Sequence, residues 1–180
     1  ELKEIEAQRP ELITSDSPSQ RVGDVLLEGF KKVEHSRRML SLNDVFNREE
    51  VEAWVERMNK LLPGSKHEFF IQVKLDGLAC ALVYQDGKFI QAVTRGDGTV
   101  GEDVSSNVRT VPSVPLTLRH SSAASGFLEG RTEVRGEIIM SKKDFEALNK
   151  KREVASQPAF ANPRNLAAGT IRQLDPYLVA

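Results

Sequence analysis

The chain has 180 residues, of which 39% are hydrophobic and 28% are charged, so it can form one compact domain with a buried core. Lys and Arg number 25 against 26 Asp and Glu, and the net charge of −1 excludes a histone-like cationic surface but not a local basic site. The single cysteine, Cys80, excludes an internal disulfide and a cysteine-rich zinc site, and no apolar run is long enough to cross a bilayer. Together these features predict a cytoplasmic protein that binds no membrane.

The first part of the chain combines a short helix with turn-rich segments. Residues 1–8 have helical spacing of apolar residues, and Pro10 ends that helix. Thr14–Gly23 is polar and rich in turn residues, which is typical of a linker, and a short helix is expected over Asp24–Phe30. His35–Phe46 has no clear period and is expected to be irregular and on the surface.

An amphipathic helix is predicted to begin after Asn47. Asn47 is a favourable N-cap, and Glu50 occupies the position at which a capping box places an acidic residue. The apolar residues that follow recur at helical spacing and are expected to pack in the core: Val51, Trp54, Val55, Met58 and Leu62.

The apolar period changes to that of strands after Glu68. Phe69–Lys74, Leu78–Tyr84 and Lys88–Thr94 are rich in apolar and β-branched residues, and Asp86-Gly87 is a typical hairpin turn between the last two. Glu133–Met140 is a further predicted strand.

The last part of the chain is expected to be mainly helical. Ser141 is expected to start a helix that ends in the basic run Lys150–Arg152. A short helix is also expected over Asn165–Leu174. Pro176–Ala180 is an apolar stretch that suggests the beginning of a strand, and both ends of the chain suggest interrupted elements of a longer polypeptide. The predicted fold class is α+β, with a mostly antiparallel sheet and flanking helices.

The segment Val73–Gly77 carries the first candidate for chemistry. Lys74 is expected at the end of an apolar strand, where burial would lower its pKa and make its amine a nucleophile. Asp76 lies two residues on and would orient the amine, while Gly77 permits a turn. The alternative is an edge-strand lysine paired with an aspartate, because a K-x-D-G pattern often occurs by chance.

A second candidate is the glycine-rich stretch Thr94–Thr110. Its glycines allow the backbone to approach a ligand, and Arg95 could clamp a phosphate or stack on a base. The acidic residues of the stretch do not have the spacing of a calcium loop, so no metal ligand is assigned in this chain. A solvated loop is the alternative.

Three further charged residues are candidates for ligand contacts. Glu137 could accept hydrogen bonds from ribose hydroxyls, or it could form a simple ion pair with Arg135. Arg164 and Arg172 lie on or beside a short helix with small residues between them, which suits approach to a phosphate backbone, although both could be ordinary surface arginines.

Several strings of the sequence resemble one family. Lys74–Gly77 resembles the nucleotidyltransferase motif that DNA ligases, RNA ligases and mRNA capping enzymes share. The strings DSPSQRVG, MLSLNDVF, TRGDGTVGEDVSSNVRT, EVRGE and FANPRNLAAGTIRQLD resemble specifically the bacterial NAD-dependent DNA ligases. The resemblance covers nearly the whole chain.

The resemblance implies an adenylation reaction and a set of site residues. Lys74 would attack the α-phosphate of NAD and hold AMP, which then passes to the 5′-phosphate of nicked double-stranded DNA before the 3′-hydroxyl seals the strand. Asp76 would assist Lys74, and Ser41 and Leu42 would lie against the adenylate. The remaining implied contacts are those of Arg95 and Glu137 with the nucleotide and of Arg164 and Arg172 with phosphate or DNA.

The resemblance also implies the setting of the reaction. The fold would be the nucleotidyltransferase (ATP-grasp-like) fold, with residues 1–29 as the tail of a helical nicotinamide-binding domain and its linker, and residues 30–180 as an adenylation domain incomplete on its C-terminal side. Mg²⁺ would act transiently, which suits the charge that phosphoryl transfer gathers. Zinc would belong only to a downstream module, and the protein would be a monomer.

One residue departs from the family pattern. Gln72 stands where the family usually has a glutamate that accepts a hydrogen bond from the adenine amino group, and its neutral amide oxygen would form a weaker bond. Two other functions stay open: a covalent nucleotidyltransferase that uses ATP or GTP, and a non-catalytic nucleic-acid-binding module. We expect the 180-residue chain by itself to be adenylated only inefficiently.

Overall fold

The computed structural model describes residues 2–14, 16–21 and 28–180, which divide into two compact units. The first unit comprises residues 1–39 together with residues 75–180, and the second comprises residues 40–74. Most of the helix expected over Asp24–Phe30 lies outside the described residues. None of the helices within the described ranges has the length and apolar character needed to span a membrane.

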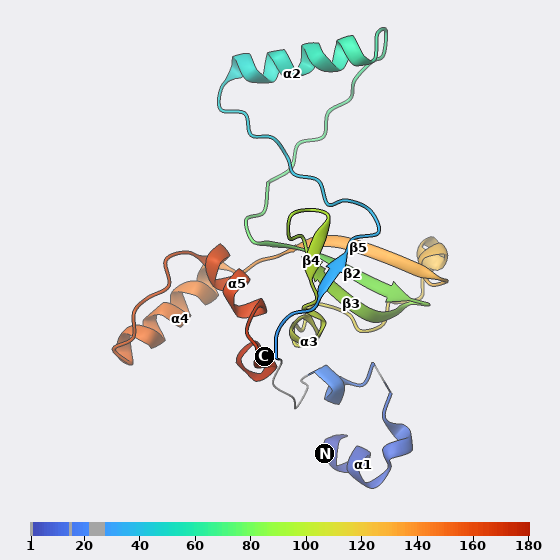
Figure 1. Cartoon of the computed structure of the whole chain (residues 1–180), viewed down its shortest axis with the longest axis vertical. Coiled ribbons are helices and arrows are strands. Elements are labelled where there is room, and N and C mark those ends of the chain that lie inside the picture. Colours follow the sequence, from blue (N-terminus) through green and yellow to red (C-terminus); the bar gives the residue numbers. More distant parts are fainter. Residues whose placement is uncertain (1, 15, 22–27) are drawn as a thin grey trace. The chain divides into compact units, whose positions relative to one another are not determined.

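A three-stranded antiparallel sheet with the order β3-β2-β5 is the centre of the first unit (Figure 1). Its strands are β2 (Leu78–Gln85), β3 (Lys88–Thr94) and β5 (Arg131–Ile138), as the sequence predicts to within a few residues. Asp86 and Gly87 join β2 to β3 with φ values of 50° and 74°, which is the left-handed conformation that such a tight hairpin turn needs.

One face of this sheet forms the hydrophobic core of the unit. Successive residues of a strand point to opposite faces, so alternate residues of β2 enter the core. Tyr84 and Phe89 meet there edge to face, with ring centroids 5.7 Å apart. The buried core residues come from the sheet, from the segments that follow it and from the end of the chain: Cys80, Tyr84, Phe89, Ala92, Val104, Val108, Val114, Leu116 and Ile171.

The stretch Thr94–Thr110 contains regular structure and is not simply the solvated loop given as the alternative. It contains β4 (Val100–Glu102), which pairs antiparallel with β1 (Lys32–Glu34), and α3 (Ser105–Arg109). The sequence did not indicate β4, because its partner lies nearly 70 positions earlier and its composition is that of a turn. Gly101 is required there, since a Cβ atom at this position would lie 1.8 Å from the Thr94 carbonyl oxygen.

The helices of the last part begin where their capping residues predict. Ser141 accepts a hydrogen bond from the Asp144 amide at 3.1 Å at the start of α4 (Lys142–Val154), and Asn162 caps α5 (Pro163–Ile171). The strand expected at Pro176–Ala180 is wrong, since these residues contain the 3₁₀ helix η4 (Pro176–Leu178). Asp175 caps η4 by accepting a hydrogen bond from the Tyr177 amide at 2.9 Å. This bond is local, whereas a strand would need a partner strand elsewhere in the chain.

The remaining elements of the first unit are short. They are α1 (Leu2–Gln8) and the 3₁₀ helices η1 (Pro10–Leu12), η2 (Pro18–Arg21) and η3 (Ser122–Phe127). Asn107 of α3 ties the end of the chain to the core, because its side-chain amide donates to the carbonyls of Ile171 and Gln173 at 2.7 Å each.

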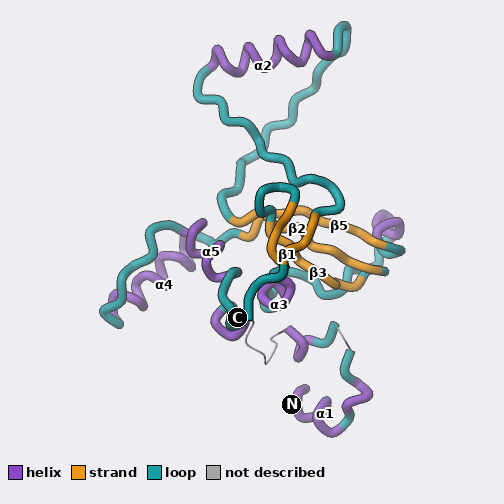
Figure 2. The backbone as a smooth tube through the Cα atoms, in the orientation of Figure 1, coloured by secondary structure: helices purple, strands orange, loops and turns teal. Residues whose placement is uncertain are grey.

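The second unit contains one helix, α2 (Arg48–Leu61), with irregular segments on both sides (Figure 2). The predicted cap is confirmed: Asn47 accepts the Glu50 amide at 2.9 Å. The expected core packing of its apolar stripe is wrong, because no residue of α2 is buried and Trp54 is 40% exposed. In this small unit the stripe has only partial cover, from contacts such as that of Trp54 with Phe69 at 5.5 Å between ring centroids.

The strand expected over Phe69–Lys74 is also wrong. The segment is irregular, pairs with no strand among the described residues, and leaves Phe70, Ile71 and Val73 more than 80% exposed. Apolar and β-branched composition indicates that a segment suits a sheet, but a strand forms only when a neighbour takes up its backbone hydrogen bonds.

Candidate functional site

Gly77 connects the K-x-D-G segment to the sheet. Its amide donates to Glu137 Oε1 at 3.1 Å, so the start of β2 is held by a side chain near the end of β5. Gly77 is buried, and a Cβ atom there would lie 2.1 Å from the Ile138 carbonyl oxygen and 2.8 Å from Ile139 Cγ2. The glycine is therefore required by the close approach of two backbones, a reason that the sequence did not reveal.

Arg164, in the first turn of α5, reaches the same point. Its Nε donates to the Gly77 carbonyl at 3.2 Å and lies 3.4 Å from Asp76 Oδ1. Both charged side chains are well exposed, so the ion pair contributes little stability and mainly orients the two groups. The structure thus brings together three of the predicted residues, Asp76, Glu137 and Arg164, around Gly77.

Glu137 does not form the alternative ion pair with Arg135. The guanidinium of Arg135 binds Glu133, with Nε 2.8 Å from Oε1, and its other nitrogens donate to the carbonyls of Arg37 and Arg38. Glu133, Arg135 and Glu137 alternate along β5 and so share one face of the sheet. The alternation of charged residues along this strand is visible in the sequence, but the pairing of Arg135 with Glu133 is not.

Arg95 lies on the same face and at the same end of the sheet as Glu137. The Arg95 amide donates to the Ala79 carbonyl at 3.0 Å, and Ala79 is paired with Glu137 across β2 and β5. Arg95, directly after β3, and Glu137, on β5, therefore lie on either side of Ala79 of the central strand, roughly 10 Å apart at two strand spacings. A cationic and an anionic side chain at this separation can contact different parts of one nucleoside phosphate.

The turn that carries Arg95 is built by an aspartate and two glycines. Asp97 Oδ1 accepts the amides of Thr99 and Val100, each at 2.8 Å, and these bonds, Val100 first, lower the pKa of Asp97. Gly96 and Gly98 have φ values of 57° and 94°, and a Cβ atom on Gly96 would lie 1.8 Å from the Val100 carbonyl oxygen. Asp97 thus shapes the turn.

Arg172 lies away from the other predicted residues. It comes directly after the last residue of α5, eight positions from Arg164. Eight residues of helix separate the two Cα atoms by roughly 12 Å along the axis. Its Nε and a terminal nitrogen bind the Glu102 carboxylate at 2.8 and 3.1 Å, and Lys32 Nζ lies 3.0 Å from the same carboxylate. The hydrogen bond from Lys32 is the largest cause that lowers the pKa of Glu102, with Arg172 adding to it.

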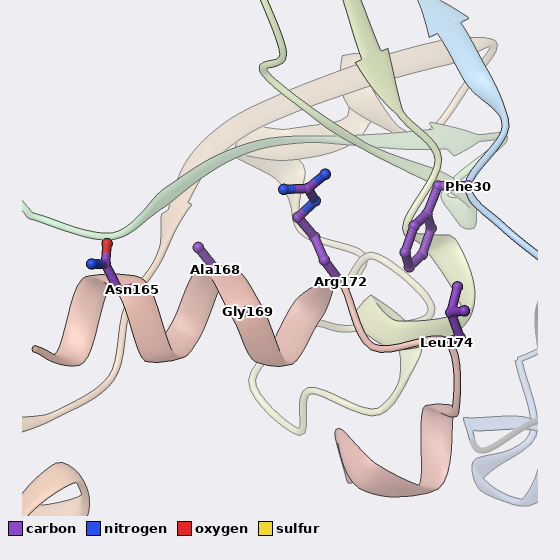
Figure 3. Close-up of a pocket in the computed structure, with 6 residues that line it drawn as sticks. All are labelled: Phe30, Asn165, Ala168, Gly169, Arg172 and Leu174. Atoms are coloured by element: carbon purple, nitrogen blue, oxygen red, sulfur yellow. The ribbon is translucent and has the colours of Figure 1, made fainter. Parts of the chain in front are cut away.

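Arg172 also lines an open hollow beside α5 (Figure 3). The figure shows Asn165, Ala168 and Arg172 along one side of the helix, with Phe30 and Leu174 beyond its end. Small residues, Ala168 and Gly169, leave the helix surface accessible here. The hollow is part of the first unit and does not include Asp76 or Glu137.

The other four predicted residues lie in the second unit. Ser41, Leu42, Gln72 and Lys74 are all exposed, and Leu42 is 77% exposed. The burial expected for Lys74 is not observed, because the segment before it is not a strand. Within the described residues, no cluster of three or more His, Cys, Asp or Glu side chains has the arrangement of a metal site.

The antiparallel α+β architecture, with a K-x-D-G segment leading into the central strand, is consistent with a nucleotidyltransferase-type fold. Residues 27–180 match the family model of the NAD-dependent DNA ligase adenylation domain. The chain therefore belongs to this family. Residues 1–23 match a second model, the DNA ligase-like N-terminal NAD⁺-binding domain.

Curated relatives agree with the family models. The chain is 50% identical over 180 residues to a DNA ligase of Koribacter versatilis, 49% identical over 180 residues to one of Acetivibrio thermocellus, and 50% identical over 179 residues to one of Thermotoga neapolitana. These alignments cover 99% to 100% of the chain but only 25% to 27% of each relative. The chain thus spans about a quarter of the length of the relatives it matches.

Proposed function

We propose that the chain supplies the adenylating part of an NAD-dependent DNA ligase. The side-chain amine of Lys74 attacks the α-phosphate of NAD and loses a proton to solvent as a phosphorus–nitrogen bond forms, and nicotinamide mononucleotide leaves with the electrons of the broken phosphorus–oxygen bond. The AMP then passes to the 5′-phosphate of nicked double-stranded DNA, and the 3′-hydroxyl displaces it to seal the strand.

The observation that carries this proposal is the position of Gly77. Gly77 ends the K-x-D-G segment and is bonded to Glu137 through its amide and to Arg164 through its carbonyl. Covalent geometry keeps the Cα atoms of Lys74 and Asp76 within about 7 Å of each other. The end of the motif that carries the nucleophile is therefore anchored where Glu137 and Arg95 share a face of the sheet.

The surroundings of each residue support a separate role. Glu137 uses Oε1 for the Gly77 amide, and a carboxylate has further acceptor capacity for a ribose hydroxyl. Arg95 offers a guanidinium to the nucleotide, and Asp76 is the acidic group that helps Lys74. Ser41, Leu42 and Gln72, on the segments before Lys74, are proposed to contact the adenosine.

The two arginines of the α5 region are proposed to contact phosphate or DNA, but they are not equivalent. Arg172 already has a bidentate partner in Glu102, so an incoming phosphate must compete with that carboxylate. Arg164 bonds through Nε to the Gly77 carbonyl and has only a long, exposed contact with a carboxylate, that of Asp76. We therefore assign the stronger phosphate contact to Arg164.

The proposal extends to cofactors, domains and setting. Mg²⁺ usually binds one or two carboxylates together with substrate phosphates, so Asp76, which is exposed, could complete a shell formed mainly by NAD. Such an ion would offset charge on the transferred phosphate. Zinc would be held by another module.

Residues 1–29 would be the tail of a nicotinamide-binding domain and its linker, and residues 30–180 would form the adenylation domain. The protein would be a cytoplasmic monomer.

The test is the intact mass of a polypeptide of the relatives' length that contains this chain. Incubation with NAD and Mg²⁺ should add one AMP, and both Lys74→Ala and Lys74→Arg should abolish the adduct, because arginine cannot be deprotonated near neutral pH. Lys66→Ala, at an exposed lysine of the same unit, is the matched control and should retain the adduct. An adduct in either Lys74 variant, or one that forms with ATP but not with NAD, would overturn the proposal.

A further inference from the structure

A five-residue segment, His35–Met39, is bonded at both ends to the turn that carries Arg95; we call this segment the strap. The His35 amide donates to the Thr99 carbonyl at 2.9 Å, and the Met39 amide donates to the Gly98 carbonyl at 2.8 Å. Gly98 leaves no room for a side chain, since a Cβ atom there would lie 2.7 Å from the Met39 carbonyl oxygen. The strap and the turn therefore fit closely along their length.

The middle of the strap is bonded to β5. Ser36 Oγ donates to Glu133 Oε2 at 2.9 Å, and Arg135 donates to the Arg38 carbonyl at 3.0 Å. Because β2 lies between β3 and β5, the strap spans the sheet from the end of β3 to β5 on the face that carries Glu137. Its position is thus fixed independently of the turn.

The side chain of His35 contacts the backbone of Arg95 directly. Its Nε2 lies 3.1 Å from the Thr94 carbonyl oxygen and 3.2 Å from that of Arg95. A carbonyl oxygen can only accept, so Nε2 carries a hydrogen that the two carbonyls share. The same Arg95 carbonyl accepts the Gly98 amide at 3.0 Å, and the Arg95 amide is bonded to Ala79.

We infer that His35 is a positioning residue for Arg95. The imidazole holds the peptide on the C-terminal side of Arg95 while Ala79 holds its amide, which fixes the direction in which the guanidinium leaves the backbone. The inference rests on the proposed function, since it concerns the contact of Arg95 with the nucleotide. A small misplacement of a binding group lowers both affinity and rate.

The test compares variants that keep or remove the donor. His35→Gln places an amide nitrogen near the position of Nε2 and should keep NAD affinity close to that of the parent, whereas His35→Ala and His35→Asn should weaken NAD binding by about 3- to 10-fold. NAD is the probe, measured by calorimetry on the full chain. Ser36→Ala is the matched control: it removes a strap bond to Glu133 and should lower the melting temperature without changing NAD affinity.

A double-mutant cycle separates positioning from general stability. If His35 acts through Arg95, His35→Ala should cause no further loss of affinity in a chain that already carries Arg95→Ala. If the two losses of NAD affinity add, the inference about His35 is overturned and the role of Arg95 stands. The same holds if Arg95→Ala weakens NAD binding but His35→Ala binds NAD as tightly as the parent. Unchanged NAD affinity in Arg95→Ala would instead overturn the proposed role of Arg95. Should His35→Ala not fold, the comparison of His35→Asn with His35→Gln decides between the same outcomes.

Discussion

Replacement of Gly77 by alanine tests the close approach on which the candidate site depends. The new Cβ atom would lie 2.1 Å from the Ile138 carbonyl oxygen, whereas such contacts are essentially never shorter than 3.0 Å. The start of β2 and the end of β5 must therefore separate by nearly 1 Å. Because the Gly77 amide is 3.1 Å from Glu137 Oε1, this movement should break that hydrogen bond.

The expected loss of stability follows from two effects. Forcing an extra methyl group into a closely packed contact costs about 1–3 kcal/mol, and losing a hydrogen bond to a charged acceptor costs about 1.5–3 kcal/mol. The effects overlap, because relief of the first causes the second, so we expect Gly77→Ala to lower the free energy of unfolding by about 2–4 kcal/mol. NAD affinity should fall as well, since Glu137 and Asp76 move with the strand.

Gly136→Ala is the matched control for Gly77→Ala. Gly136 lies on β5 next to Glu137, and no atom of the described residues lies within 4 Å of a Cβ built on it. Alanine there should be neutral or stabilise by about 0.4–1 kcal/mol through the unfolded state. Urea unfolding followed by far-ultraviolet circular dichroism measures both, because the only tryptophan, Trp54, lies in the second unit. Unfolding free energies within about 0.5 kcal/mol of each other would refute the reasoning.

Two further predictions concern Gln72 and Glu102. Gln72→Glu should strengthen NAD binding by roughly 0.5–1.5 kcal/mol through a charge-assisted bond to adenine, and Gln72→Leu should weaken it by a similar amount. Calorimetry measures both affinities, and no change in either variant would show that this side chain does not contact adenine. The folded pKa of Glu102 is depressed below 4.5, chiefly by Lys32, so its stabilising contribution is complete above about pH 4.5 and is lost as the pH falls through the folded pKa. The difference in unfolding free energy between the parent and Glu102→Gln should therefore shrink below pH 4.5, and a constant difference would contradict the assignment.

Elements whose signals lie close together in the sequence were predicted well. Asn47 and Ser141 each accept an amide three residues later, and Asp86-Gly87 takes the left-handed conformations of its turn. Such features involve a few adjacent residues, and their free energy depends little on the rest of the chain. Family membership was likewise predicted from short strings, and the match to residues 27–180 confirms it.

Elements that need a distant partner were predicted less well. Phe69–Lys74 has the composition of a strand but is irregular, whereas β4, with the composition of a turn, pairs with β1. Composition states how well a segment suits a sheet, but the hydrogen bonds that make it a strand come from another segment. The end of the chain follows the same rule, since Pro176–Leu178 forms a helical turn through a local cap.

By itself, the sequence determined which residue types were available for chemistry, the local elements and the family. The tertiary structure decided which of those residues meet. It bonded Glu137 to the Gly77 amide, gave Arg172 to Glu102, and placed His35 against the backbone of Arg95. Each of these pairs is at least 60 residues apart in sequence, so no local pattern could reveal it. The contacts of Glu137 and His35 depend on the register of β2 with β3 and β5, and that of Arg172 depends on β4, which pairs with β1.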